Sequence, residues 1–130
     1  MIKLAVPKEQ HLNESRVSVT PDCIPQLKKI GFDIFIESGA GERASFPDSM
    51  YIKAGAKISK NPKDLFKNAK LVIKIQRPFK STKKNELSFF EPDTNFLGLI
   101  YSSRFKQEFK LLKKKKVNVF AMELMPRISR

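Results

Sequence analysis

Two arginines on segments that follow apolar runs are the side chains in this chain best suited to bind an anionic ligand. Arg16 lies on the polar segment after the run Ile2–Val6, and Arg127 lies behind a proline near residue 130. A guanidinium can hold a carboxylate or a phosphate through two parallel hydrogen bonds. For Arg16 the alternative is a structural ion pair with Glu9 or Glu14, and the sequence leaves both interpretations open.

The other side chains that could do chemistry favour structural roles. His11 is the only histidine and has no cysteine at metal-ligand spacing, so we interpret it as a solvated loop residue. Cys23 lies within a predicted helix, where we expect a buried or half-buried thiol. The segment Ser38–Gly41 has two glycines but lacks the third glycine of a dinucleotide loop, and therefore predicts a tight turn. We assign no catalytic residue and no metal ligand.

The composition is that of a basic globular protein. Hydrophobic residues make up 41% of the chain, and the formal net charge is +13, from 20 lysines and 6 arginines against 13 acidic residues. Lysine is the poorer residue for bidentate contacts with bases or phosphates, so nucleic acid is not the expected partner. The charge is consistent either with solvated surface lysines or with an anionic partner. No apolar run approaches the roughly 20 residues of a membrane helix, and the single cysteine fits a reducing cytosol.

The elements that must position the arginines alternate along the chain. Apolar runs expected to form strands are residues 2–6, 33–37, 56–58, 71–75, 95–101 and 117–122. Helical patterns between them begin near residues 20, 47, 61, 83 and 105. This alternation predicts a single α/β domain over residues 1–130, with a three-layer, mostly parallel twisted sheet of six or seven strands and helices on both faces, similar to Rossmann or flavodoxin folds.

Apolar residues at helical spacing predict which helix faces are buried. Ile24, Leu27 and Ile30 form one stripe that ends before a glycine, and the next helix carries the apolar residues Met50, Tyr51 and Ala54. A third set, Phe105, Phe109 and Leu112, precedes four lysines at a helix C-terminus, where cations complement the helix dipole. The run 117–122 predicts a buried strand.

Ligands of such sheets bind beyond the carboxyl ends of the strands. The segments expected there are residues 7–19, 38–47, 76–82, 102–104 and 123–130. A glycine-rich phosphate loop does not occur anywhere in the sequence. We therefore expect the chain to be the N-terminal portion of a larger cofactor protein.

Five short motifs resemble, in order, the N-terminal signature shared by alanine dehydrogenases and the alpha subunit of proton-translocating NAD(P) transhydrogenase. They are VPKE at residues 6–9, NESRV at 13–17, TP at 20–21, ESGAG at 37–41 and AGA at 54–56. The resemblance covers the whole chain. It implies the same α/β fold, without the dinucleotide-binding second domain that follows in the family.

Gln76, Tyr101 and the motif at residues 125–130 separate the two enzymes within this resemblance, whereas Arg16 is a position that alanine dehydrogenases share with this chain. In alanine dehydrogenases the residue corresponding to Arg16 holds the substrate carboxylate. A lysine and a catalytic histidine stand in them where this chain has Gln76 and Tyr101. Glutamine cannot supply the cation that polarises a keto acid, and tyrosine, with a pKa near 10, is a poor base at neutral pH. Arg16, Gln76 and Tyr101 are therefore predicted to line a cleft rather than to catalyse amino-acid oxidation.

The motif MPRISR at residues 125–130 resembles the transhydrogenase loop that contacts the nicotinamide end of NAD(H). By this resemblance, Arg127, Ile128 and Ser129 bind the cofactor. The complete enzyme then passes a hydride from NADH to NADP, coupled to proton translocation, with NADP(H) on a partner component. Implied partners are a membrane domain, an NADP-binding beta subunit and a second copy in a homodimer.

The resemblance also implies a cytoplasmic protein, peripheral to the inner membrane through partner segments. This piece alone is expected to be inactive. Two alternatives remain: a fragment of an alanine dehydrogenase-like amino-acid oxidoreductase, supported by Arg16, and a basic nucleic-acid-binding module, supported only by the charge.

Overall fold

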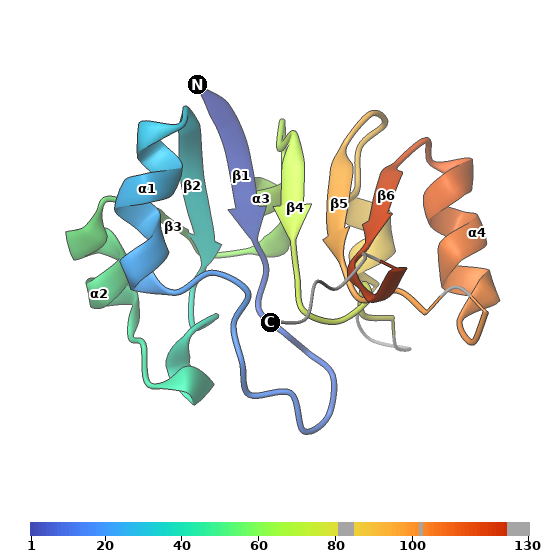
Figure 1. Ribbon diagram of the computed structural model, residues 1–130, viewed down its shortest axis with the longest axis horizontal. Helices are drawn as coiled ribbons and strands as arrows, with labels where there is room; N and C mark the ends of the chain where they lie inside the picture. Colours follow the sequence, from blue (N-terminus) through green and yellow to red (C-terminus); the bar gives the residue numbers. More distant parts are fainter. Residues whose placement is uncertain (81–84, 102, 125–130) are drawn as a thin grey trace, which may run out of the picture.

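A parallel sheet forms the centre of the computed structural model, which describes residues 1–80, 85–101 and 103–124 (Figure 1). Its strands are β1 (Ile2–Val6), β2 (Phe32–Glu37), β3 (Lys57–Ser59), β4 (Leu71–Ile73), β5 (Asn95–Gly98) and β6 (Asn118–Ala121). They make one six-stranded sheet in the order β3-β2-β1-β4-β5-β6, and every pair of neighbours is parallel. The predicted parallel α/β sheet is therefore confirmed.

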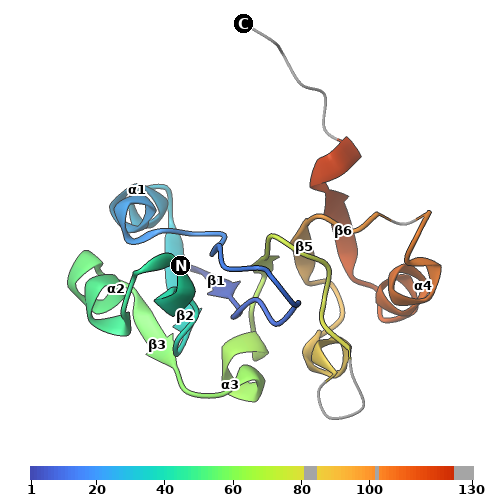
Figure 2. The ribbon, with the colours of Figure 1, turned by 90° about the horizontal axis from the view of Figure 1, so that it is seen from below.

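Helices cover both faces of the sheet. The α-helices are α1 (Ile24–Lys29), α2 (Asp48–Ala54), α3 (Pro62–Phe66) and α4 (Lys106–Lys114). The short 3₁₀ helices are η1 (Pro21–Cys23), η2 (Glu42–Ala44), η3 (Glu86–Phe89) and η4 (Met122–Leu124). Figure 2 shows α1 on one side of the sheet, and α3 with α4 on the other. We call the side of α1 the front face and the side of α3 the back face.

The direction in which each strand connection runs explains this division. From β1 the chain moves outward through β2 to β3, then returns across β1 and moves the opposite way through β4, β5 and β6. Because parallel crossovers are right-handed, reversing the direction of travel reverses the face that the connection covers. The connections α1 and α2 therefore share the front face, and α3, η3 and α4 share the back face.

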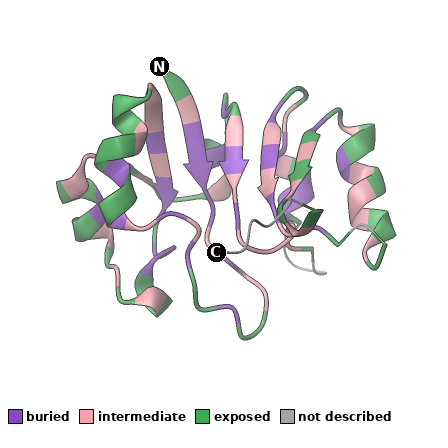
Figure 3. Ribbon diagram, in the orientation of Figure 1, coloured by how far each residue is buried: buried purple, intermediate pink, exposed green. Residues whose placement is uncertain are grey.

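Two buried clusters result, one on each face of the sheet. The front cluster centres on Leu4, Val6, Ile24, Ile34, Ile36 and Tyr51. The back cluster centres on Leu65, Phe66, Val72, Phe96, Ile100 and Leu112, with Ala5. Central strand β1 contributes to both clusters because successive side chains of a strand point to opposite faces. Figure 3 shows this buried centre flanked by half-buried outer elements.

Two apolar side chains that the sequence predicted to be buried, Ile30 and Phe120, are exposed. Ile30 is 72% exposed at the C-cap of α1. Phe120 is 54% exposed because β6 is an edge strand, and among the described elements all the crossovers beside it cover the back face. The predicted buried strand at 117–122 is therefore a half-exposed edge strand. Cys23, expected inside, is also exposed, on η1.

Local signals account for the helix ends. Asn61 caps α3, its side-chain oxygen accepting the backbone N–H of Asp64 at 2.9 Å, and a proline follows it. Gly31 and Gly55, with φ of 109° and 110°, turn the chain after α1 and α2, as glycine does most easily. Thr20 was expected to cap a helix, but its side chain makes no capping hydrogen bond.

Candidate functional site

The candidate site lies where the loops after β1 and β4 begin. These two strands are neighbours at the point where the chain reverses direction across the sheet, so their loops diverge toward opposite faces. In open α/β sheets this switch point is where a crevice for ligands opens. The loop after β1 carries Arg16, and the loop after β4 carries Gln76.

Glu14 joins these two residues. Its carboxylate accepts three hydrogen bonds from Arg16, from Nε at 2.9 Å, from Nη2 at 3.0 Å and from the backbone N–H at 3.0 Å. Gln76 Nε2 donates to Glu14 Oε1 at 2.9 Å. The structural ion pair left open by the sequence is thus present, with Glu14 as the partner. Two predicted cleft residues, Arg16 and Gln76, come together through a third residue that the prediction had not placed in the cleft.

The charges of Glu14 and Arg16 are already paired with each other in the absence of a ligand. The hydrogen bonds from Arg16 lower the pKa of Glu14 to about 2, so the carboxylate is charged at neutral pH. The same contacts raise the pKa of Arg16. The side chain of Glu14 is 7% exposed, whereas that of Arg16 is 67% exposed. A substrate carboxylate would therefore have to compete with Glu14 for the fork of the guanidinium.

Beneath this cluster a buried charge network fixes the loop after β4. Glu9 accepts the backbone N–H groups of Ile75 at 2.8 Å and Gln76 at 3.2 Å. Lys74 Nζ lies 2.6 Å from Glu86 Oε1 and 3.9 Å from Glu9 Oε1. Burial raises the pKa of Glu9, and the nearby ammonium of Lys74 opposes that rise. The network sets the backbone position from which Gln76 reaches Glu14.

Sequence reasoning missed this network, although one signal pointed to it. Lys74 directly follows the apolar run of β4 and is fully buried. A buried ammonium must be paired, so a lysine in such a run predicts a buried carboxylate somewhere else in the chain. The sequence could not say which carboxylates, because Glu9 and Glu86 lie far from Lys74 along the chain.

His11 is a structural residue at the carboxyl-terminal edge of the sheet, rather than the solvated loop residue that we expected. Its Nε2 is 2.8 Å from the carbonyl oxygen of Arg77, and its ring meets Phe79 edge-on at 5.2 Å. Burial lowers its pKa, so the imidazole is neutral at pH 7. The Arg77 guanidinium in turn lies 3.5 Å from the centre of the Phe105 ring, a cation–π contact.

Tyr101 is held at the end of the next strand, β5. Its backbone N–H and that of Ile100 donate to the two carboxylate oxygens of Glu123, at 2.6 and 3.1 Å. The Tyr101 side chain is 38% exposed. No hydrogen bond between described residues joins that side chain to Arg16 or Gln76. The predicted cofactor contacts Arg127, Ile128 and Ser129 lie outside the described residues.

The glycine turn after β2 does not suit a phosphate. The N–H of Gly39 donates to Asp48 Oδ1 at 2.9 Å, and Ser38 Oγ donates to Asp48 Oδ2 at 2.7 Å. A Cβ on Gly41 would lie 2.6 Å from the Phe46 carbonyl oxygen, so this glycine serves internal packing. A carboxylate already uses the donors that would cradle a phosphate and would repel it. The predicted tight turn is confirmed, and its donors at Ser38 and Gly39 are bound to Asp48.

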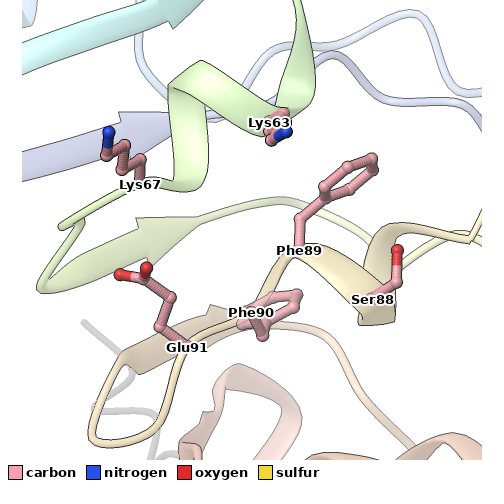
Figure 4. A pocket seen from close by; sticks show the side chains of 6 residues that line it. All are labelled: Lys63, Lys67, Ser88, Phe89, Phe90 and Glu91. Atoms are coloured by element: carbon pink, nitrogen blue, oxygen red, sulfur yellow. The ribbon is translucent and has the colours of Figure 1, made fainter.

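Two open cavities lie beside η3, on the back of the sheet. One, of about 580 Å³, is lined by Gln10, Glu37, Lys60 and Phe89 among others. The second, of about 490 Å³, is lined by Lys63 of α3, by Lys67 just after that helix and by the segment from Ser88 to Glu91 (Figure 4). Neither cavity includes Arg16, Gln76 or Tyr101. The predicted cleft residues therefore do not line either of these larger hollows.

Comparison with known proteins decides the family. A family model described as "Alanine dehydrogenase/PNT, N-terminal domain" matches residues 5–130. The chain belongs to this family. The match begins inside β1 and covers every described element of the sheet, as the five sequence motifs had predicted.

Relatives of both enzyme types are found. The first part of NAD(P) transhydrogenase subunit alpha of Rhodospirillum rubrum is 33% identical over 130 residues, covering 99% of this chain and 34% of that protein. NAD(P) transhydrogenase subunit alpha of Haemophilus influenzae is 35% identical over 127 residues, covering 98% of this chain and 24% of that protein. Alanine dehydrogenase of Methanococcus maripaludis is 32% identical over 120 residues, covering 92% of this chain and 31% of that protein.

Solved structures agree with this membership of the alanine dehydrogenase/PNT family. Transhydrogenase from Sinorhizobium meliloti matches with a TM-score of 0.88 and 31% identity, over 98% of this chain and 36% of that one. An L-alanine dehydrogenase matches with a TM-score of 0.84 and 26% identity, over 92% of this chain and 32% of that one. The chain thus spans about a third of the length of the Rhodospirillum relative and of both structures.

Proposed function

We propose that this chain serves as the N-terminal domain of the NAD(H)-binding component of a proton-translocating NAD(P) transhydrogenase. The observation that carries the proposal is the pairing of Gln76 with Glu14, at the position where alanine dehydrogenases resemble this chain but place a lysine. The full-length likeness to transhydrogenase alpha subunits supports the same choice. We treat residues 1–130 as one domain of that component.

In this role the described residues hold the loops of the site in place and do not react themselves. The Glu14 cluster and the buried Lys74 network hold the loops after β1 and β4 rigid against each other. Arg127, Ile128 and Ser129 would contact the nicotinamide end of NAD(H), as the family resemblance implies. The cofactor itself supplies the hydride chemistry, and we assign no catalytic side chain or metal ligand to this chain.

The partners follow from the same proposal. NADP(H) would bind a separate component, the beta subunit, and a membrane domain would carry the protons. The NAD(H)-binding component would form a homodimer and stay at the cytoplasmic side of the inner membrane through these partners. Within the described residues, no helix has the length and apolar character needed to cross a bilayer.

An alanine dehydrogenase role is the second candidate, because Arg16 stands where those enzymes hold the substrate carboxylate. Here Glu14 occupies both nitrogens of the Arg16 fork. Gln76 is neutral, so it does not supply the charge of the lysine that alanine dehydrogenases carry at this position. Binding of a keto acid would require breaking an ion pair without an electrostatic gain at Gln76.

A chimera tests whether the chain serves in a transhydrogenase or in an alanine dehydrogenase. The chain would replace the matching N-terminal third of the Rhodospirillum rubrum subunit, and the purified product would be assayed with its transhydrogenase partner components. We expect hydride transfer from NADH to an NADP analogue and no alanine-dependent reduction of NAD. A folded chimera that reduces NAD with alanine would instead establish the alanine dehydrogenase role. A folded chimera with neither activity would contradict both.

A further inference from the structure

The edge of the sheet opposite the candidate site carries a concentration of lysines. Backbone hydrogen bonds tie the turns of this edge together: Ile2 to Gly31 at 3.1 Å, Lys70 to Lys3 at 3.0 Å and Asp93 to Lys116 at 2.9 Å. The turns therefore form one continuous row along the amino-terminal ends of the strands, visible at the top of Figure 1.

Seven exposed lysines project from this row, and we call them the lysine rim. They are Lys28, Lys29, Lys67, Lys70, Lys113, Lys114 and Lys116. The acidic residues at the same edge include Asp33, Glu91 and Asp93; Asp33 pairs with Lys57 at 3.2 Å, and Glu91 accepts the backbone N–H of Asn68 at 2.8 Å. The rim is therefore strongly positive.

Some of this pattern follows from the fold alone. Helices that connect parallel strands end at the amino-terminal edge, and lysines there complement the helix dipoles. Lys115 shows such a structural role, since its Nζ donates to the carbonyl oxygen of Leu87 at 2.6 Å. The seven rim lysines differ, because no hydrogen bond or ion pair between described residues holds their side chains. Lys70 and Lys116 also lie beyond the ends of helices.

Two exposed aliphatic side chains lie at the same edge of the sheet as the lysine rim. Ile2 is 52% exposed and Ile30 is 72% exposed, and the backbone hydrogen bond from Ile2 to Gly31 joins the segments that carry them. Lys28 and Lys29 directly precede Ile30 in sequence. Exposed aliphatic side chains beside a row of lysines are the pattern of surfaces that lie on anionic membranes, with apolar groups at the headgroup boundary and cations over acidic lipid.

We propose that the lysine rim, with Ile2 and Ile30, docks onto an anionic phospholipid surface. Nucleic acid fits less well, because the rim has no arginine for bidentate phosphate contacts and offers aliphatic rather than aromatic side chains to a base. This contact is independent of NAD(H) and leaves the carboxyl-terminal edge, with Arg16 and Gln76, facing away from the bilayer.

Vesicle flotation tests the proposal with the 130-residue chain. Vesicles of phosphatidylcholine alone are compared with vesicles containing about one-third phosphatidylserine, at low and at high salt. We expect binding only to the anionic vesicles, weakened steeply by salt because the contacts are exposed.

Two matched pairs of variants locate the surface. Replacing Lys28, Lys29, Lys113 and Lys114 by glutamine should weaken binding by on the order of a hundredfold. The same four changes at the opposite edge, Lys60, Lys63, Lys80 and Lys106, should weaken it by less than about fivefold. Ile30→Ser should also lower binding, whereas Leu12→Ser, an exposed aliphatic residue of the opposite edge, should not. Circular dichroism confirms that each variant is folded.

Three outcomes would overturn the proposal. One is equal binding to neutral vesicles, and another is equal loss from the two sets of lysine variants. The third is binding to a duplex oligonucleotide at least as tight as to the anionic vesicles, with Ile30→Ser having no effect on either. That last result would make the rim a general polyanion surface.

Discussion

The carboxylate of Glu14 makes the stability of the fold depend on pH. Its pKa falls from 4.5 to about 2 in the folded chain, chiefly through its hydrogen bonds with Arg16. A carboxyl group whose pKa is lower in the folded state contributes its full stability above the unfolded pKa and loses it as the pH falls through the folded pKa. The relevant window is therefore pH 4.5 down to about 2.

Glu14→Gln removes this contribution. We expect the free energy of unfolding at pH 7 to fall by roughly 1–2 kcal/mol, a figure reduced for solvent screening of the exposed Arg16. The difference from the parent chain should narrow as the pH falls from 4.5 to 2. Urea unfolding at a series of pH values measures it, with Asp22→Asn on the exposed surface as control. A difference that stays constant with pH would contradict the assigned ion pair.

The buried pair of Lys74 and Glu86 leads to a double-mutant prediction. Glu86→Leu leaves the Lys74 ammonium without its partner at 2.6 Å and should cost about 3–5 kcal/mol of stability. Adding Lys74→Met should recover some of that loss, because no unpaired ammonium then remains. Denaturant unfolding of the two single variants and the double variant gives the coupling energy. Simple additivity of the two single changes would show that the pair is not coupled.

At the scale of elements, the turn between β2 and α2 depends on a glycine for space. A Cβ on Gly41 would lie 2.6 Å from the Phe46 carbonyl oxygen and 2.8 Å from the Tyr51 ring. Gly41→Ala should therefore destabilise the fold by about 1–3 kcal/mol through overpacking. Gly31→Ala is the control, since its Cβ would meet nothing within 4 Å and only its positive φ opposes the change. Thermal unfolding compares them, and a smaller loss at Gly41 than at Gly31 would refute this packing role.

The elements were more predictable than the site because their signals are local. The apolar runs of β1 and β2 and the Asn61-Pro62 helix start are read from neighbouring residues, and the structure places elements there. Ile30 was misjudged because it lies at the C-cap, just past the last turn of α1. Phe120 was misjudged because its burial depends on which face the crossovers cover, which periodicity does not encode. The Glu9–Lys74–Glu86 network was missed because its members meet only in the folded chain.

The candidate site was predictable only in outline. The carboxyl-terminal edge and the residues Arg16 and Gln76 could be identified from strand order and resemblance. The bridge that Glu14 makes between them could not, because its two contacts belong to loops that follow different strands. The cleft role of Arg16, Gln76 and Tyr101 stays a prediction.

For the whole molecule, we expect at most weak binding of NAD(H) by the 130-residue chain. A dinucleotide is held chiefly by its pyrophosphate on a glycine-rich turn, and the donors of the turn at Gly39 are already bound to Asp48. Hydrogen bonds of roughly 1 kcal/mol each, from Arg127 and its neighbours, do not offset an association cost of about 4 kcal/mol or more. Fluorescence titration with NADH should not saturate below about 1 mM. A micromolar dissociation constant lost on Arg127→Ala would contradict this.

The two core clusters also determine how the chain can fold during synthesis. The front cluster draws its buried residues from 4 to 56, and the back cluster draws its own from 65 to 117, apart from Ala5. The buried residues of the front cluster therefore come from one contiguous stretch, and Leu71 and Ile73 pack against it only after that stretch has left the ribosome. The first 60 or so residues can condense around β1 while the second stretch is still being translated. One edge of β1 then stays unpaired until β4 emerges, and this unpaired edge is the point at which a nascent chain of this protein is most exposed to misassembly with its neighbours.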